Sequence, residues 1–84
     1  MSRTIARSPR QLGHAIQQIR REKGLTQTEL GQLVGLRQEM VSKIESGQPG
    51  VRFATVCDLL AALGLEMTIG PRSKSSTADI EDAF

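Results

Sequence analysis

Five polar side chains between positions 37 and 43 are of the types that contact the edges of DNA bases. They share one side of a helical pattern and comprise Arg37, Gln38, Glu39, Ser42 and Lys43. A glutamine amide pairs with adenine through two hydrogen bonds, arginine and lysine donate to guanine, and glutamate accepts from cytosine. A solvated helix surface has a similar composition, so the surrounding elements must decide whether these side chains contact bases or only solvent.

The sequence offers little for catalysis or for metal binding. His14 is the only histidine and Cys57 the only cysteine, so neither has a second ligand of its own type for a zinc site, and no intramolecular disulfide can form. Segment 47–50 lacks the Lys-Ser/Thr pair of a phosphate-binding loop, and no catalytic triad or carboxylate pair is recognisable. We expect no enzyme activity, metal or cofactor, and we expect Cys57 to be a small core residue in a reducing, cytoplasmic protein.

A first helix is predicted over about residues 9–23. Ser8 followed by Pro9 is typical of an N-cap with proline at the first helical position, and Gly24 is placed to end the helix in a left-handed conformation. Its apolar stripe has helical spacing and comprises Leu12, Ala15, Ile16 and Ile19. The sequence therefore predicts an amphipathic helix ahead of the polar side described above.

Two short helices separated by a tight turn should follow. Thr26 and Glu29 have the spacing of a capping box, and Gly35 is placed to stop the helix that begins there. The third helix is expected from about Arg37 to Glu45. The inward side chains of both helices are Leu30, Val34, Met40, Val41 and Ile44, with Leu33 exposed. Gly31 faces the crossing, where the lack of a side chain lets the helices approach closely. Such a pair can brace one helix on the DNA backbone and insert the next into the major groove.

The last elements are a fourth helix over about 53–63 and a strand over 65–69. The predicted apolar face of the helix comprises Phe53, Val56, Cys57, Leu60 and Leu63, with Leu59 beside it. Leu65, Met67 and Ile69 alternate with polar residues at the period of a strand, and Gly70-Pro71 ends the pattern. Apart from a weak candidate at Arg3–Ala6 the chain has no second strand, so we expect pairing across a dimer.

The charge distribution favours an anionic partner for the first part of the chain. Of the 84 residues, 38% are hydrophobic and only 2% aromatic, with a net charge of +2. Residues 1–24 carry six positive groups and one negative (net +5), whereas residues 25–84 carry five positive and eight negative (net −3). Four arginines of this segment are either additional phosphate contacts or solvated side chains, and both alternatives stay open: Arg7, Arg10, Arg20 and Arg21.

Residues 26–47 resemble the Xre/Cro family of helix-turn-helix repressors, which includes the phage lambda repressor. The matching positions are Thr26-Gln27, Leu30, Gly35, Val41-Ser42, Ile44-Glu45 and Gly47. The resemblance assigns Gln27 to a phosphate contact at the start of the second helix. It assigns Gln38, Glu39 and Lys43 to base contacts, with Arg37 and Ser42 at base edges or phosphate. Ser46 and the loop after it resemble the second phosphate clamp of the family.

A narrower resemblance covers residues 8–70 and points to the HipB antitoxins. It rests on the lead-in from Ser8 to Gly13, on the spacing of four helices, and above all on Leu65-Glu66-Met67-Thr68-Ile69 after the last helix. In these proteins the terminal strand pairs across the dimer, which implies that Leu65, Met67, Thr68 and Ile69 are dimerisation residues here. The resemblance also implies a HipA-type serine/threonine kinase toxin as partner and autoregulation of a toxin–antitoxin operon. Glu39 departs from expectation, because its carboxylate would lie in a groove lined by phosphates.

The predicted architecture is all-α: a lambda-repressor-like domain of four to five helices at 8–70 with a short C-terminal β-strand, and a disordered tail at 71–84. We expect a cytoplasmic homodimer, with no membrane-spanning segment, that binds a palindromic operator in double-stranded DNA and is nucleoid-associated when bound. Two alternatives remain open. One is a phage or stand-alone Cro-like regulator without a toxin, and the other is an antitoxin that acts mainly by binding its kinase.

Overall fold

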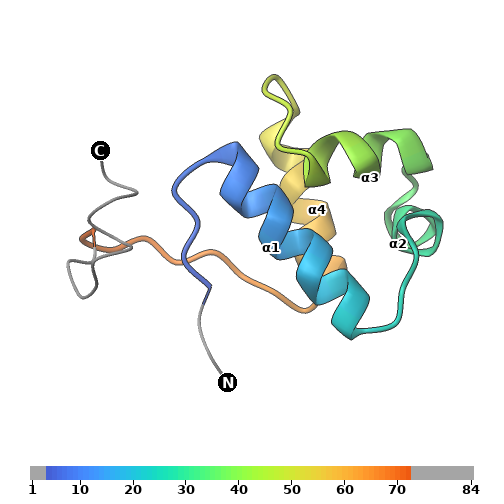
Figure 1. The fold of residues 1–84 in the computed structure, drawn as a ribbon, viewed down its shortest axis with the longest axis horizontal. Helices are drawn as coiled ribbons and strands as arrows, with labels where there is room; N and C mark the ends of the chain where they lie inside the picture. The colour runs from blue at the N-terminus through green and yellow to red at the C-terminus, as the bar shows by residue number, and fades with distance from the viewer. Residues whose placement is uncertain (1–3, 73–84) are drawn as a thin grey trace.

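Four helices make up the regular structure of residues 4–72, the part of the chain that the computed structural model describes. They are α1 (Pro9–Glu22), α2 (Gln27–Val34), α3 (Gln38–Glu45) and α4 (Phe53–Ala62). In the view of Figure 1, α1 lies in front of α4, α3 runs along one edge of the molecule, and α2 is seen end-on beside them. The helices predicted from the sequence agree with these bounds to within about one residue at each end.

The first two helices begin where the sequence places their caps. The Ser8 hydroxyl accepts a hydrogen bond from the backbone N–H of Gln11 at 3.1 Å, and Pro9 occupies the first turn of α1. At the start of α2 the Thr26 hydroxyl accepts from the N–H of Glu29 at 3.0 Å, while the Glu29 carboxylate accepts from the N–H of Thr26 at 2.9 Å. This confirms the predicted capping box, which satisfies two N–H groups that a bare helix end would leave unpaired.

The other two helices have no such local start signal. Arg37 and Arg52 occupy the N-cap positions of α3 and α4, and neither side chain caps its helix. Helices of eight or ten residues are unstable in isolation. The position of α3 therefore depends on tertiary packing rather than on its own sequence.

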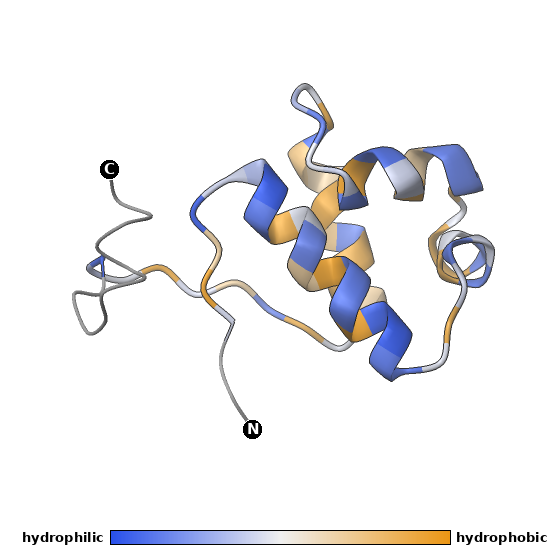
Figure 2. Ribbon diagram, viewed as in Figure 1, coloured by the Kyte–Doolittle hydropathy of each residue, from blue (hydrophilic) through white to orange (hydrophobic). Residues whose placement is uncertain are grey.

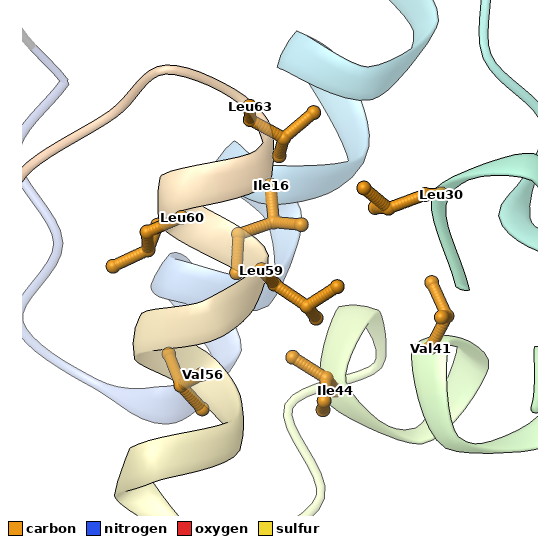
Figure 3. Packing of buried hydrophobic residues seen from close by; sticks show 8 residues of the cluster. All are labelled: Ile16, Leu30, Val41, Ile44, Val56, Leu59, Leu60 and Leu63. Carbon is orange, nitrogen blue, oxygen red and sulfur yellow. The ribbon is translucent and has the colours of Figure 1, made fainter. Parts of the chain in front are cut away.

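Aliphatic side chains from all four helices meet in a single core, as Figure 3 shows. The buried set comprises Ile16, Leu30, Val41, Ile44, Val56, Leu59, Leu60 and Leu63. Burying a side chain of this size contributes about 1.5–3 kcal/mol to the free energy of unfolding. The inner sides of α2 and α3 thus belong to the core, and the polar residues on the opposite side of α3 face outward.

The predicted apolar face of α4 is wrong at its edges. Phe53 is 66% exposed and Leu59 is fully buried, whereas the sequence suggested the reverse, and Cys57 is only half-buried. Val56, Leu59, Leu60 and Leu63 fit one helical stripe, so the core selects this set over the one that includes Phe53. Phe53 is the first residue of α4, where the chain arrives from the loop at 47–52, and its side chain stays largely outside the core.

Beyond α4 the described chain, up to residue 72, has no assigned strand. Leu65 packs against the core, but Met67 is 45% exposed and Ile69 is 103% exposed. Figures 1 and 2 show this segment leaving the helices as an extended trace with hydrophobic positions along it. Residues 4–6 of the weak candidate Arg3–Ala6 are also without strand structure. Residues 4–72 therefore supply no pairing partner for 65–69, and the strand predicted there is not formed in this part of the chain.

The predicted tail at 71–84 falls mainly on residues 73–84, which lie outside the described residues, while Pro71 and Arg72 are exposed and irregular. Within residues 4–72, none of the helices has the length and apolar character needed to cross a bilayer.

Candidate nucleic-acid interface

The turn between α2 and α3 fixes how the two helices sit against each other. Gly35 ends α2 in the left-handed region, with a φ of 74°, and the N–H of Leu36 donates to the carbonyl oxygen of Gly31 at 2.8 Å. A Cβ atom on Gly31 would lie 2.5 Å from the carbonyl oxygen of Leu36, well inside van der Waals contact. The predicted close approach is therefore present, and it is made by the turn itself.

A second close approach, between α1 and α3, was not anticipated from the sequence. Gly13 is buried in the second turn of α1, where a Cβ atom would lie 2.5 Å from the carbonyl oxygen of Glu45. A glycine in the middle of a helix costs about 1 kcal/mol relative to alanine, and this cost is the signal that marks Gly13 in the sequence. The contact lets the end of α3 rest directly on α1.

With its inner side held in this way, α3 presents its polar side to solvent. Of the predicted base-contacting residues, Arg37, Gln38, Glu39 and Lys43 are exposed and Ser42 is half-buried. Figure 2 colours the outer part of α3 hydrophilic and the part that faces α4 hydrophobic. The structure thus brings these side chains together on one accessible helix surface.

Two glutamines that the sequence assigned to different roles are hydrogen-bonded to each other. The Nε2 of Gln38, the first residue of α3, donates to Oε1 of Gln27, the first residue of α2, at 2.5 Å. Gln38 is exposed and Gln27 half-buried. The bond joins the beginnings of the two helices at the surface, so the predicted phosphate-contacting and base-contacting residues form one unit.

The same unit continues into the interior of the protein. The Nε2 of Gln27 donates to Oε1 of Glu45 at 3.0 Å. Glu45 is also bound by Arg20, whose Nε lies 2.6 Å from Oε2 and whose Nη2 lies 3.1 Å from Oε1. The Arg20 and Glu45 side chains are only 8% and 1% exposed. Both interpretations that the sequence left open for Arg20, a phosphate contact or a solvated side chain, are therefore wrong.

Each of the three guanidinium nitrogens of Arg20 has a hydrogen-bond partner in this arrangement. Besides its two bonds to Glu45, Arg20 donates from Nη1 to the carbonyl oxygen of Leu25 at 2.7 Å. Among the described residues no buried side-chain nitrogen or oxygen atom lacks a hydrogen-bond partner. A buried ion pair is tolerated when its geometry is good and its remaining polar atoms are satisfied, and both conditions hold here.

The C-terminal part of α3 adjoins a shallow hollow that carries two cations. Lys43 and Arg52 both line it, as do Gln48 and Thr55. The Ser46 hydroxyl, just after α3, donates to the carbonyl oxygen of Lys43 at 2.9 Å and is exposed. Arg52 was missed as a candidate by the sequence analysis. The available signal is a cation two residues after the loop Gly47-Gln48-Pro49-Gly50 and immediately before a helix without a short polar N-cap.

The remaining polar candidates are dispersed. Arg10 and Arg21 are exposed, and the backbone N–H of the half-buried Arg7 donates to the Gln11 side chain at 2.6 Å. On the surface of α1, Nε2 of His14 lies 3.2 Å from Nε2 of Gln18. Over residues 4–72 no group of three or more histidine, cysteine or acidic side chains is arranged to hold a metal ion.

The fold and the exposed polar side of α3 define a class of DNA-binding regulators. The helix-turn-helix family matches residues 16–69, more than half of the chain, and the chain belongs to this family in its Xre-like form. Among characterised proteins, it is similar to antitoxin HipB of Escherichia coli strain K12. The two are 31% identical over 74 residues, which cover 88% of this chain and 84% of that protein.

Solved structures of HipB proteins have the same fold. The chain superposes on a HipB variant from a HipB–O2 20mer complex with a TM-score of 0.79. The two are 30% identical, and the match covers 86% of this chain and all of the other. It superposes on a chain of a HipA–HipB–O2–O3 complex with a TM-score of 0.76 and 30% identity, covering 82% of this chain and 97% of that one. These likenesses confirm the resemblance to HipB-like helix-turn-helix repressors inferred from residues 8–70.

The family membership also decides the class of activity. The relatives are DNA-binding antitoxins and transcriptional regulators, not enzymes. The chain is accordingly a helix-turn-helix DNA-binding regulator related to the HipB antitoxins.

Proposed function

We propose that this protein is a HipB-like antitoxin that represses transcription of its own toxin–antitoxin operon by binding a palindromic operator as a homodimer. The observation that carries the proposal is the accessibility of the polar side of α3 while its other side is built into the core. Such a helix can enter the major groove without any change of fold. The similarity to HipB supports the finer assignment.

Within this proposal the outer side of α3 contacts bases. Gln38 pairs with adenine, Lys43 and Arg37 donate to guanine or to phosphate, and Ser42 bonds whichever group lies opposite it. Glu39 follows Gln38 in the first turn of α3 and is exposed as well. Its carboxylate accepts from the amino group of cytosine and is repelled where phosphates approach, so it discriminates among sequences more than it adds affinity.

Phosphates are bound at the flanks of this surface. Gln27 uses one hydrogen of its amide on Glu45, which leaves the second for a phosphate oxygen at the start of α2. Ser46 contributes a second contact once its hydroxyl turns from the carbonyl oxygen of Lys43 to donate to a phosphate oxygen. Because phosphate contacts release condensed counterions, binding weakens steeply with salt.

The dimer is formed by the segment after α4. Leu65, Met67 and Ile69 alternate along this segment, and the last two are exposed in the single chain. Pairing with the same segment of a second copy, through Thr68 and its neighbours, gives the backbone a hydrogen-bonding partner and covers both side chains. The two recognition helices then contact successive major grooves roughly 34–36 Å apart.

The protein partner of this dimer is a HipA-type serine/threonine kinase toxin. A relative occurs in a complex with HipA, and this chain covers nearly all of that relative's length. The proposed pair works in the cytoplasm, on the nucleoid while the operator is bound. Neutralisation of the toxin and repression of the operon then use the same molecule.

Selection of DNA by the purified protein tests the DNA-binding half of the proposal. A random duplex pool should yield a palindrome whose half-sites are separated by about one helical turn. Binding to the selected duplex should weaken linearly in log–log salt titrations, by about 0.9 of a decade per decade for each phosphate contacted. Enrichment of no common sequence after several rounds contradicts the proposal.

Co-expression with the kinase that this proposal expects to be encoded beside the gene tests the other half. The kinase and this chain should co-elute in gel filtration, and kinase toxicity should fall when both are produced. Intact operator binding without any complex, or the absence of a neighbouring kinase gene, favours a stand-alone Cro-like regulator instead.

A further inference from the structure

The hydrogen bonds that link Arg20, Glu45, Gln27 and Gln38 run in one direction. The Glu45 carboxylate can only accept, and it accepts from Nε and Nη2 of Arg20 and from Nε2 of Gln27. Because the carboxylate is 1% exposed, solvent does not compete for these positions. With the carboxylate held in this way, the Gln27 amide can be oriented in only one way toward it.

That arrangement determines the orientation of the next amide. If the Gln27 amide were turned around, its carbonyl oxygen would face the negatively charged carboxylate at the present 3.0 Å separation, which is repulsive. Gln27 therefore points its NH2 group inward and its oxygen outward to Gln38. Because this oxygen can only accept, Gln38 must turn its NH2 group toward it, and Nε2 of Gln38 indeed lies 2.5 Å from Oε1 of Gln27.

The consequence concerns the hydrogen-bonding groups that Gln38 has left. One of its two amide hydrogens is engaged by Gln27, so one hydrogen and the carbonyl oxygen remain for a partner. In the major groove adenine offers one acceptor, N7, and one donor, the N6 amino group, which match this remaining pair. Guanine offers two acceptors, N7 and O6, and the tethered amide has only one hydrogen for them.

We propose that Glu45, held by Arg20, is a positioning residue that makes Gln38 selective for adenine over guanine. The inference rests on the proposed function and extends it to two buried residues that touch no DNA. An untethered glutamine can rotate its NH2 group toward both acceptors of guanine. The buried ion pair prevents this rotation through Gln27, and base selectivity is set from inside the protein.

The experiment compares variants on duplexes that differ at one operator position. The double variant Arg20→Met/Glu45→Leu removes the ion pair as a unit and leaves no lone buried charge. Arg21→Met/Glu22→Leu is the matched control, because it makes the same substitutions on exposed neighbours in the last turn of α1. Gln38→Ala identifies the base pair that Gln38 contacts, and competition titrations measure the adenine-to-guanine affinity ratio at that position.

The wild-type ratio should be about 5- to 150-fold, the range expected for one bidentate base contact. In Arg20→Met/Glu45→Leu it should fall to less than about threefold, with selectivity at the other positions retained, while the control keeps the wild-type ratio. In a Gln38→Ala background the double variant should have no further effect on base preference. A purely structural ion pair would instead lower affinity for all duplexes equally.

Gln27→Met keeps the inference testable if the core variant does not fold. This substitution breaks the same chain of hydrogen bonds at the half-buried surface position and leaves the ion pair intact. It should lower the adenine-to-guanine ratio as strongly as the core variant. An unchanged ratio in either variant, or an equal loss in the Arg21/Glu22 control, overturns the inference. A wild-type protein that selects no sequence contradicts the proposed function itself, which separates the two failures.

Discussion

The side chains of Arg20 and Glu45 form a two-point ion pair that joins the last turn of α1 to the last turn of α3. The residues are 25 positions apart in the chain, and their shorter contact, Nε to Oε2, is 2.6 Å. The pair lies beside the point where the end of α3 rests on Gly13. It therefore anchors the inner side of the helix whose outer side is the candidate DNA-binding surface.

Breaking this pair from one side should be costly to stability. Arg20→Met leaves the Glu45 carboxylate buried with only Gln27 as a donor, and we expect the free energy of unfolding to drop by about 3–5 kcal/mol. Arg20→Met/Glu45→Leu should recover most of the loss. Urea denaturation monitored by circular dichroism measures both. The exposed control Arg21→Met should stay within about 0.5 kcal/mol of the wild type, and an equal effect at the two arginines would contradict the account.

Gly31→Ala should disturb the turn between α2 and α3. The added methyl group meets the carbonyl oxygen of Leu36 at 2.5 Å, so the turn must shift, at a cost of about 1–3 kcal/mol. Thermal unfolding and affinity for the selected operator should both decrease. Gly70→Ala is the matched control, because a Cβ atom there has no neighbour within 4 Å. Equal stability of the two variants would show that the close approach is relieved without cost.

Thr26→Ala should weaken the start of α2. It removes the hydroxyl that accepts from the N–H of Glu29, and the loss of such a cap costs about 1 kcal/mol. The change is measured by chemical denaturation. Thr28→Ala, an exposed position in the first turn of the same helix, should have a smaller effect. A larger loss at Thr28 than at Thr26 would argue against the capping box as the stabilising element.

Gln38→Ala should reduce specific DNA binding without affecting non-specific binding. Loss of a bidentate base contact costs about 1–3 kcal/mol on the selected operator and nothing on random duplex. Fluorescence anisotropy titrations on both duplexes make the comparison. Gln18→Ala, a glutamine on the exposed surface of α1, serves as the control. If affinity falls equally on operator and random DNA, Gln38 is a phosphate contact and not a base contact.

Met67→Lys/Ile69→Lys should prevent dimerisation while leaving the helical domain folded. Both side chains are exposed in the single chain, so the substitutions do not disturb its core. Sedimentation equilibrium should give a dimer for the wild type and a monomer for the variant, and operator affinity should fall accordingly. Glu66→Gln, on the other side of the same segment, should remain dimeric. A dimeric lysine variant would place the interface elsewhere.

Features that depend on a few neighbouring residues could be predicted from the sequence. The caps at Ser8 and Thr26, the left-handed Gly35 and the outward side of α3 all follow from local spacing. Each is decided by hydrogen bonds or periodicity within about one helical turn. This local information was sufficient for the bounds of α1 and α2 and for the surface that contains Gln38.

Features that join distant residues could not be predicted in this way. Arg20 follows the buried Ile16 by four residues, so helical spacing places it on the inner side of α1, but only the packing of α1 on α3 brings it the carboxylate of a buried ion pair. The choice between Phe53 and Leu59 on α4 depends on which side meets the other helices. The strand predicted at 65–69 is not formed within residues 4–72, so the local alternation of hydrophobic and polar residues was not sufficient to establish it.

The most direct test of the central claim is a titration of isotope-labelled protein with the selected duplex, followed by amide chemical shifts. The account predicts that the largest changes occur at Gln27 and along Arg37–Lys43, including the side-chain amides of Gln27 and Gln38. The exposed residues Gln18 and Asp58 on α1 and α4 should change little. Saturable binding that shifts other helices while α3 stays unchanged would contradict the assignment of this helix to DNA.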